Sequence, residues 1–179
     1  MSNSLDPVQA ILRAASFAAH KHKDQRRKDA AASPYINHPL SLASILRAEG
    51  GVDDVTVLIA ALLHDTIEDT ETDYDEIRGQ FGTEVAEIVA EVTDTKWLKK
   101  ASRKRLQISK AARASSGAKL VKLADKIANL RDIIASPPSD WSLERKRKYF
   151  DWAKEVVDQI RGANAKLERR FDQLYRQRP

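Results

Sequence analysis

Apolar residues recur at steps of three and four along most of this chain of 179 residues, and that spacing constrains the fold more than any other feature. The segment 116–134 is the clearest case. Its apolar positions on one helical face include Leu120, Leu123, Ile127 and Leu130. No segment keeps the period-two alternation of an exposed strand. The pattern therefore predicts an all-α fold.

Capping residues and helix breakers divide this pattern into about eight to ten helices. Asp6 followed by Pro7 is typical of a helix start, and Thr72 with Asp75 resembles a capping box. After the first helix, which starts at Pro7, the predicted helices span residues 40–48, 55–64, 72–81, 83–92, 99–114, 116–134, 141–160 and 163–175. The chain has no internal repeat and no linker long enough to divide it, so we expect a single domain over residues 1–179.

The composition excludes several classes of protein. The longest apolar run, residues 57–63, is far shorter than the roughly 18 residues of a membrane span. Residues 1–7 lack the basic and apolar regions of a secretory signal. The chain has no cysteine, which excludes disulfides, a thiolate nucleophile and cysteine-ligated zinc. We therefore expect a cytoplasmic protein that does not bind membranes.

The chain is basic, with a formal net charge of +5 and a pI of about 9.4. This balance fits either a small polyanionic substrate or nucleic acid, and many of the lysines are expected to lie on solvated helix faces. The basic residues gather in three local clusters, at 26–28, 99–105 and 145–148, rather than in one tail. We hypothesise that these clusters converge on a pocket.

Two imidazoles and two carboxylates are candidate metal ligands: His38, His64, Asp65 and Asp125. Such groups are costly to bury unless they are paired or bind a metal. Each one alone is typical of a satisfied core polar group, but the adjacent His64 and Asp65 at one buried helix end favour a metal site. A mixed nitrogen and oxygen set suits Mn, Fe, Co or Zn better than Ca or Mg.

Two further carboxylates, Glu68 and Asp69, follow within one turn of the His-Asp pair. Beside a divalent metal they could orient a water molecule or accept its proton, and the alternative is an exposed acidic loop. Asn129 lies four residues after Asp125 and thus on the same helical face, from which it could contact a base or a sugar.

Longer motifs around these residues resemble the hydrolase domain of RelA/SpoT proteins, and more closely the small alarmone hydrolases, which are stand-alone versions of that domain. The motifs are RRKD at 26–29, YINHP at 35–39, AALLHDTIED at 60–69, and KLVKLADK at 119–126 with NLR at 129–131. The resemblance runs from about residue 6 to about residue 174. It implies an HD-domain helical bundle.

The resemblance also implies an activity: a (p)ppGpp 3′-pyrophosphohydrolase, usually dependent on Mn²⁺, that releases diphosphate and leaves GDP or GTP. The implied metal ligands are His38, His64, Asp65 and Asp125, and the implied catalytic residues, which position and activate water, are Glu68 and Asp69. The implied substrate-binding residues are Arg27 and Lys28 against the base, Asn129 beside the base or ribose, and Lys100, Arg145 and Tyr149 at phosphate or sugar.

One segment departs from the family pattern, because Ala30, Ala31 and Ala32 stand where a proline is expected. This loop would border the base, so an enzyme that prefers adenosine alarmones or NADPH is an alternative. An alternative from another class is a basic helical module that binds nucleic acid and keeps a vestigial metal site. Intact candidates at every metal and water-activating position weigh against that module. We expect a nucleotide substrate and no nucleic-acid partner.

Overall fold

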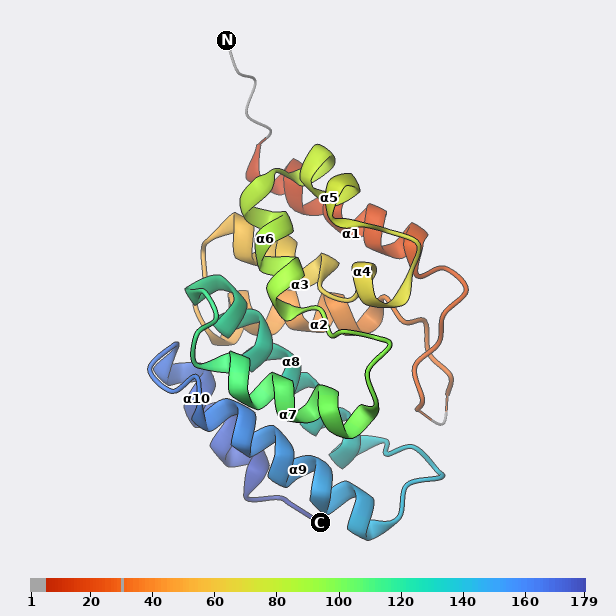
Figure 1. Cartoon of the computed structure of the whole chain (residues 1–179), viewed down its shortest axis with the longest axis vertical. Helices are drawn as coiled ribbons and strands as arrows, with labels where there is room; N and C mark the ends of the chain where they lie inside the picture. The colour runs from red at the N-terminus through yellow and green to blue at the C-terminus, as the bar shows by residue number, and fades with distance from the viewer. Residues whose placement is uncertain (1–5, 30) are drawn as a thin grey trace.

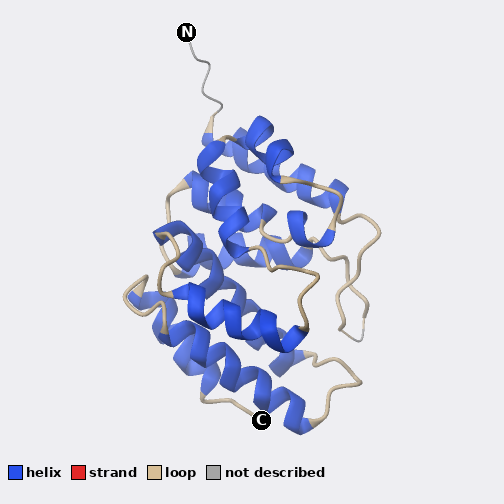
Figure 2. Cartoon of the chain, in the orientation of Figure 1, coloured by secondary structure: helices blue, strands red, loops and turns tan. Residues whose placement is uncertain are grey.

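The computed structural model describes residues 6–29 and 31–179, and in these residues the chain folds into ten α-helices and one short π-helix (Figure 1). The elements are α1 (Pro7–Lys21), α2 (Asn37–Ser44), the π-helix η1 (Ile45–Glu49), α3 (Val55–Leu63), α4 (Thr66–Asp69), α5 (Tyr74–Phe81), α6 (Thr83–Val92), α7 (Lys100–Ala111), α8 (Ser116–Ala135), α9 (Leu143–Asp158) and α10 (Ala165–Tyr175). Figure 2 shows helices and connecting loops only, and the one extended pairing in the described residues is a bridge between Arg26 and Pro34. The predicted all-α fold is confirmed.

Helix α3 lies at the centre of one half of the molecule, where it packs against α1, α2, α6 and α8 (Figure 1). Every residue from Val57 to Leu63 is buried, as its continuous apolar sequence predicts. The helix begins at Asp54, whose carboxylate accepts a hydrogen bond from the backbone N–H of Thr56 at 2.9 Å. A helix that is apolar on all sides thus carries His64 and Asp65 at its C-terminal end.

Helix α8 connects the two halves, because it packs against α2, α3 and α6 on one side and α9 and α10 on the other. Its core side chains Leu123, Ile127 and Leu130 are fully buried. The observed span Ser116–Ala135 extends one residue beyond the predicted one. This helix brings Asp125 and Asn129 over the ends of α2 and α3.

Four details of the predicted helices were wrong. The helix predicted at 40–48 begins earlier, at Asn37, and continues as the π-helix η1. Asp73 rather than Thr72 caps α5, through a hydrogen bond from the backbone N–H of Glu76. Helix α9 is shorter than the predicted 141–160, at Leu143–Asp158, and Gly162, with a φ of 92°, lies in the break before α10. The short helix α4 was not predicted. None of the described helices is long and apolar enough to cross a membrane.

Candidate active site

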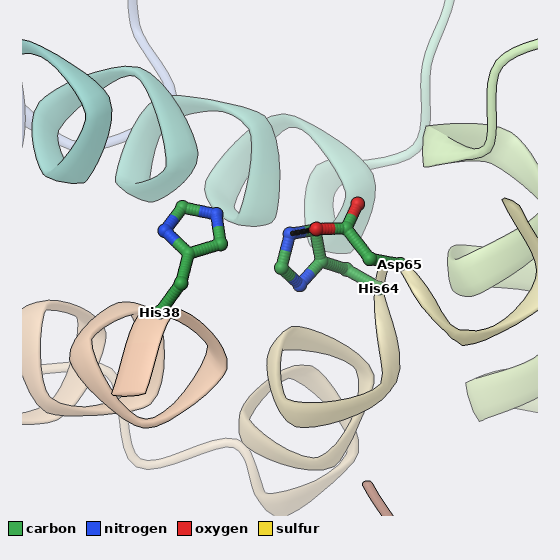
Figure 3. A group of neighbouring side chains, drawn as sticks. All are labelled: His38, His64 and Asp65. Carbon is green, nitrogen blue, oxygen red and sulfur yellow. Dashed lines mark ion pairs between the residues drawn. The ribbon is translucent and has the colours of Figure 1, made fainter. Parts of the chain in front are cut away.

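Three of the four predicted metal ligands form a tight cluster below α8. One ligand atom from each of His38, His64 and Asp65 lies within 4.8 Å of the others. Figure 3 shows His38 on α2, and His64 and Asp65 just after α3, with their side chains directed towards the α8 ribbon. The fourth residue, Asp125 on α8, places its Oδ1 atom 3.2 Å from His38 Nε2. The structure therefore brings together all four residues that the sequence singled out.

The two nitrogen atoms of His64 have different surroundings. Nδ1 lies 2.9 Å from the carbonyl oxygen of Ala61, so this nitrogen carries the ring proton in the neutral imidazole. Nε2 then presents a lone pair, and it is buried without a hydrogen-bond partner among the described residues although Asp65 Oδ2 lies 2.8 Å away. Either a shared proton or a metal cation between these two atoms satisfies both. Burial opposes protonation of His64, but Asp65 raises the pKa of this imidazole, and a bound metal ion would replace the shared proton.

The separations between these atoms match neighbouring ligands of one ion. Metal–nitrogen and metal–oxygen bonds of about 2.0–2.2 Å at a right angle put two ligand atoms about 3 Å apart. The observed values are 2.8 Å between His64 and Asp65 and 3.2 Å between His38 and Asp125. His38, His64 and Asp65 therefore fit a divalent transition-metal ion, and Asp125 lies next to His38 at a distance compatible with a fourth ligand.

Polar groups around the cluster hold its two carboxylates in place. The hydroxyl of Tyr35 donates a hydrogen bond to Asp65. Asp125 accepts hydrogen bonds from Lys126 Nζ at 2.8 Å and from Asn129 Nδ2 at 2.6 Å. Such surrounding contacts fix the orientation of metal-binding side chains.

The site keeps its carboxylates ionised in spite of their burial. Burial opposes ionisation of Asp65, but His64 and His38 hold the pKa of this carboxyl below its usual value. Burial likewise opposes ionisation of Asp125, and Lys126 with His38 holds its pKa well below the usual range. Burial lowers the pKa of His38, which favours the neutral imidazole that binds metals. The site thus presents two anionic oxygens and a neutral nitrogen donor.

Glu68 and Asp69 lie on α4 beside this cluster, and are not an exposed acidic loop. Glu68 accepts a hydrogen bond from the backbone N–H of Asp94 at 3.1 Å and pairs with Arg103 at 3.0 Å. Burial is the main reason that the pKa of Glu68 is raised to about 6. Asp69 pairs with Lys96 at 3.3 Å. A half-buried carboxylate with a pKa close to neutral is well suited to exchange protons with water.

Two adjoining cavities open from the cluster. The first, of about 300 Å³, contains His38, Asp65, Glu68 and Asp125 among its lining residues. The second, of about 320 Å³, lies between the loop that follows α1 and the end of α8. The residues that line both cavities are Arg27, Tyr35, Asp69, Asn129, Trp141 and Tyr149. Together the cavities have room for a nucleotide next to the metal cluster.

Most predicted substrate-binding residues line these cavities. Lys28 lines the second cavity and Lys100 the first, while Arg27, Asn129 and Tyr149 line both. Arg145 is the exception, because it lines neither cavity. Its guanidinium lies over the ring of Trp141, 4.4 Å from the centroid, and that ring separates it from the cavities. Two of the three basic clusters therefore converge directly on the site, and the third touches its rim.

Sequence reasoning missed several residues of this site. Arg103, Lys104 and Trp152 line the first cavity, and Trp141 lines both. A cation stacks on one of these aromatic rings, since Lys104 Nζ lies 4.5 Å from the centroid of the Trp152 ring. The only signal in the sequence was the basic cluster at 99–105, which does not show which of its members face inwards. Ala30 of the predicted base loop lies outside the described residues.

Comparison with known proteins shows that most of the chain is similar to HD-domain proteins. A family model described as HD domain matches residues 14–150. The guanosine-3′,5′-bis(diphosphate) 3′-pyrophosphohydrolase MESH1 of Mus musculus is 53% identical over 168 residues, which cover 94% of this chain and 94% of the relative. The MESH1 protein of Xenopus tropicalis is 56% identical over 165 residues, 92% of each chain.

A solved structure of a related protein has the same fold as this chain. It is described as a metazoan orthologue of SpoT that hydrolyses ppGpp and plays a role in starvation responses. This chain matches it with a TM-score of 0.93 and 47% identity over 98% of both chains. A crystal structure from Listeria monocytogenes matches with a TM-score of 0.62 and 30% identity, covering 78% of this chain and 97% of the other.

Proposed function

This chain belongs to the HD-domain family and, within it, to the MESH1-type guanosine-3′,5′-bis(diphosphate) 3′-pyrophosphohydrolases, and on that premise we propose that it removes the 3′-diphosphate of (p)ppGpp. The products are GDP or GTP and inorganic diphosphate. The observation that carries the proposal is the His38, His64, Asp65 and Asp125 set at the floor of cavities lined by cations. This arrangement suits a substrate that carries several phosphoryl charges.

The enzyme is metal-dependent, and we propose Mn²⁺ as its ion, held by His38, His64, Asp65 and Asp125. Two imidazoles with two carboxylates are a ligand set that Mn²⁺ accepts and that Ca²⁺ does not prefer. When bound, the ion supplies Lewis-acid polarisation of a phosphoryl oxygen and lowers the pKa of water. The contacts from Tyr35 and Asn129 to the two carboxylates support this assignment, because they fix the oxygens in one orientation.

Glu68 and Asp69 are proposed to position and deprotonate the attacking water. The Glu68 carboxylate is fixed by Asp94 and Arg103 and lines the same cavity as the metal cluster. In the reaction the water oxygen bonds to the phosphorus next to the 3′ oxygen, and the water proton passes to the Glu68 carboxylate. The bond between that phosphorus and the 3′ oxygen breaks, and the 3′ oxygen takes up the proton held by Glu68 and leaves as a hydroxyl. Glu68 thereby returns to its carboxylate form.

The proposed substrate contacts follow from the lining of the two cavities. Lys28 lines the second cavity and Lys100 the first, where they can neutralise phosphates. Arg27 lies over the Tyr35 ring, 5.7 Å from its centroid, and forms a flat edge on which a base can rest. The side-chain oxygen of Asn129 accepts a hydrogen bond from the Arg27 guanidinium at 3.4 Å, and the amide group can turn towards a ribose or base. Tyr149 lines both cavities from α9, and Arg145 lies behind the Trp141 ring.

We propose two further properties of the protein. A cytoplasmic location is supported by the absence of cysteine, which is usual for proteins of reducing compartments. A single domain over residues 1–179 is supported by the way α8 shares one core with helices from both halves of the chain.

The proposal is tested by incubating purified protein with ppGpp after metal removal by EDTA and again after reloading with Mn²⁺. We expect no turnover in the stripped protein and restored release of diphosphate with Mn²⁺, at a higher rate than with Mg²⁺ or Ca²⁺. Turnover that survives complete removal of the metal would reject the metal assignment. A higher rate with Zn²⁺ or Co²⁺ than with Mn²⁺ would keep the site and change the proposed ion.

A further inference from the structure

His22 is a buried side chain that the proposed reaction does not use. It follows directly after α1, and its residue is only 2% exposed. Its Nδ1 atom lies 2.7 Å from the side-chain oxygen of Gln25, while Nε2 is buried without a hydrogen-bond partner among the described residues. An unpaired buried ring nitrogen costs free energy that an apolar ring at this position would avoid. Packing alone therefore does not account for a histidine here.

Gln25 connects His22 to the helix that carries the proposed water-activating residues. Its side-chain nitrogen donates a hydrogen bond to the backbone carbonyl oxygen of Asp69 at 2.6 Å. Because that carbonyl can only accept, the amide of Gln25 is fixed in one orientation, with its oxygen towards His22. His22 Nδ1 must then carry the ring proton and donate the hydrogen bond to Gln25. These groups form a directional chain of hydrogen bonds from the end of α1 to the end of α4.

The contact from Gln25 satisfies the C-terminal end of α4. This helix has only four residues, so its last carbonyl groups find no partner within the helix. Gln25 binds the carbonyl of Asp69, and Lys96 binds that of Glu68 at 2.8 Å. The Lys96 side chain is 63% exposed and competes with water for its contact, whereas the contact from Gln25 is partly buried. Of these two contacts, the one from Gln25 is the better protected.

The loop on the other side of this contact has hydrogen bonds of its own. The backbone N–H of Tyr35 donates to the carbonyl of Gln25 at 3.1 Å, and the backbone N–H of Arg27 donates to the carbonyl of Ser33 at 2.8 Å. The ring of His22 also packs against the ring of Tyr35, with the centroids 4.8 Å apart. Loss of the Gln25 amide would thus release α4 and leave the loop, which carries Arg27, in place.

We propose that His22 and Gln25 are positioning residues, which hold α4 against the loop that follows α1 and so keep the carboxylates of Glu68 and Asp69 beside the metal cluster. This role rests on the proposed function, which assigns Glu68 and Asp69 to the attacking water. Neither His22 nor Gln25 lines either nucleotide cavity, so both act through α4 and not on the substrate.

The first experiment measures the hold on α4 without any substrate. Amide hydrogen exchange is followed by mass spectrometry in peptides that cover residues 65–72 of the metal-loaded protein. Gln25→Met keeps an unbranched side chain and removes both polar groups, and Gln9→Met is the matched control, because Gln9 is exposed on α1. We expect exchange to be about tenfold faster or more in the Gln25→Met variant only, with exchange across α6 unchanged. Equal exchange in this variant and the wild type would overturn the proposal.

The second experiment measures the turnover of ppGpp. His22→Phe keeps a ring against Tyr35 and removes the N–H donor, and His20→Phe makes the same change at an exposed position of α1. We expect kcat to fall by about 10–100-fold in the His22→Phe and Gln25→Met variants, with KM and metal content unchanged, since a misplaced catalytic group slows the chemical step. The double variant should be no slower than the slower single variant, because both changes break the same chain.

Fully additive losses in the double variant would contradict this chain, since the two residues would then act independently. A raised KM with unchanged kcat, or loss of metal in the Gln25→Met variant, would contradict a role through α4. Thermal unfolding of each variant ensures that kcat is measured on folded protein. If the wild type does not hydrolyse ppGpp, the proposed function fails, while the exchange experiment still decides whether Gln25 holds α4.

Discussion

His64 Nε2 lies 2.8 Å from Asp65 Oδ2, while the other ring nitrogen of His64 faces the carbonyl oxygen of Ala61. The ring is thereby fixed with Nε2 next to an anionic oxygen. Burial opposes protonation of His64 but Asp65 raises its pKa, and a divalent ion can take the place of the proton that the two groups share. The central role that we assign to this pair can be tested by removing either its oxygen or the contacts that orient it.

Asp65→Ala removes one of the two anionic ligands that we propose, and we expect loss of both bound metal and ppGpp hydrolysis. The metal content is measured by mass spectrometry after gel filtration in metal-free buffer. Asp53→Ala is the control, because Asp53 is a highly exposed carboxylate that pairs with Arg47 on the surface. Full metal content in the Asp65→Ala variant would contradict the assignment of this residue as a ligand.

Tyr35→Phe keeps the aromatic ring and removes the hydroxyl that donates a hydrogen bond to Asp65. We expect Mn²⁺ affinity or turnover to fall by about 10–100-fold, as for other contacts that orient metal ligands. The control is Tyr175→Phe, which removes a tyrosine–aspartate hydrogen bond of 3.1 Å to Asp151, far along the chain from every metal ligand. Equal Mn²⁺ titration curves and turnover for the Tyr35→Phe variant and the wild type would show that this contact does not support the site.

Glu68→Gln is expected to retain the metal and to lower turnover by about 10²–10⁴-fold, the usual loss for a general base. The pH dependence gives a second test. Burial raises the pKa of Glu68 to about 6, and a general base must be deprotonated to act. The rate should therefore fall as the pH drops through about 6 and be constant just above it.

The acidic limb of the rate profile should be absent from the residual activity of the Glu68→Gln variant. Glu87→Gln is the matched control, since Glu87 is exposed on α6, and it should keep both the rate and the limb. Turnover close to that of the wild type in the Glu68→Gln variant would remove this residue from the mechanism.

Arg27→Ala tests the nucleotide cavities separately from the metal. Arg27 lines both cavities and is held there by Asp132, so we expect KM for ppGpp to rise by about 10–100-fold while the metal content stays unchanged. Arg47→Ala removes an equally charged side chain from an exposed surface pair and should leave KM unchanged. An unchanged KM in the Arg27→Ala variant would place the substrate elsewhere.

The helices could be predicted from the sequence wherever apolar spacing and caps agree. Helix α8 was placed to within one residue, because its buried positions repeat over five turns. The π-helix η1 and the cap at Asp73 could not be predicted, since they depend on contacts with neighbouring helices and not on the local sequence alone. Thr72, which resembled the cap, is instead buried.

The sequence could predict that His38, His64, Asp65 and Asp125 come together, because they are chemically unusual for the buried or half-buried positions that they occupy. The cavity walls could not be predicted, since a tryptophan or a lysine in a helix is common and only the packing shows which way it faces. Trp141 and Trp152 come from one segment of the chain, yet they meet Tyr35 and His38 from its first quarter around the same space.

The most direct test of the central claim is the reaction itself. Metal-loaded protein is incubated with ppGpp, pppGpp, ppApp, pppApp and NADPH, and the products are separated by anion exchange with an EDTA control. We predict that ppGpp and pppGpp yield diphosphate with GDP and GTP, that EDTA abolishes the reaction, and that these substrates turn over fastest. Faster turnover of the adenosine compounds or NADPH would contradict the guanosine preference, and no turnover of any substrate by protein with verified metal would contradict the proposed hydrolase.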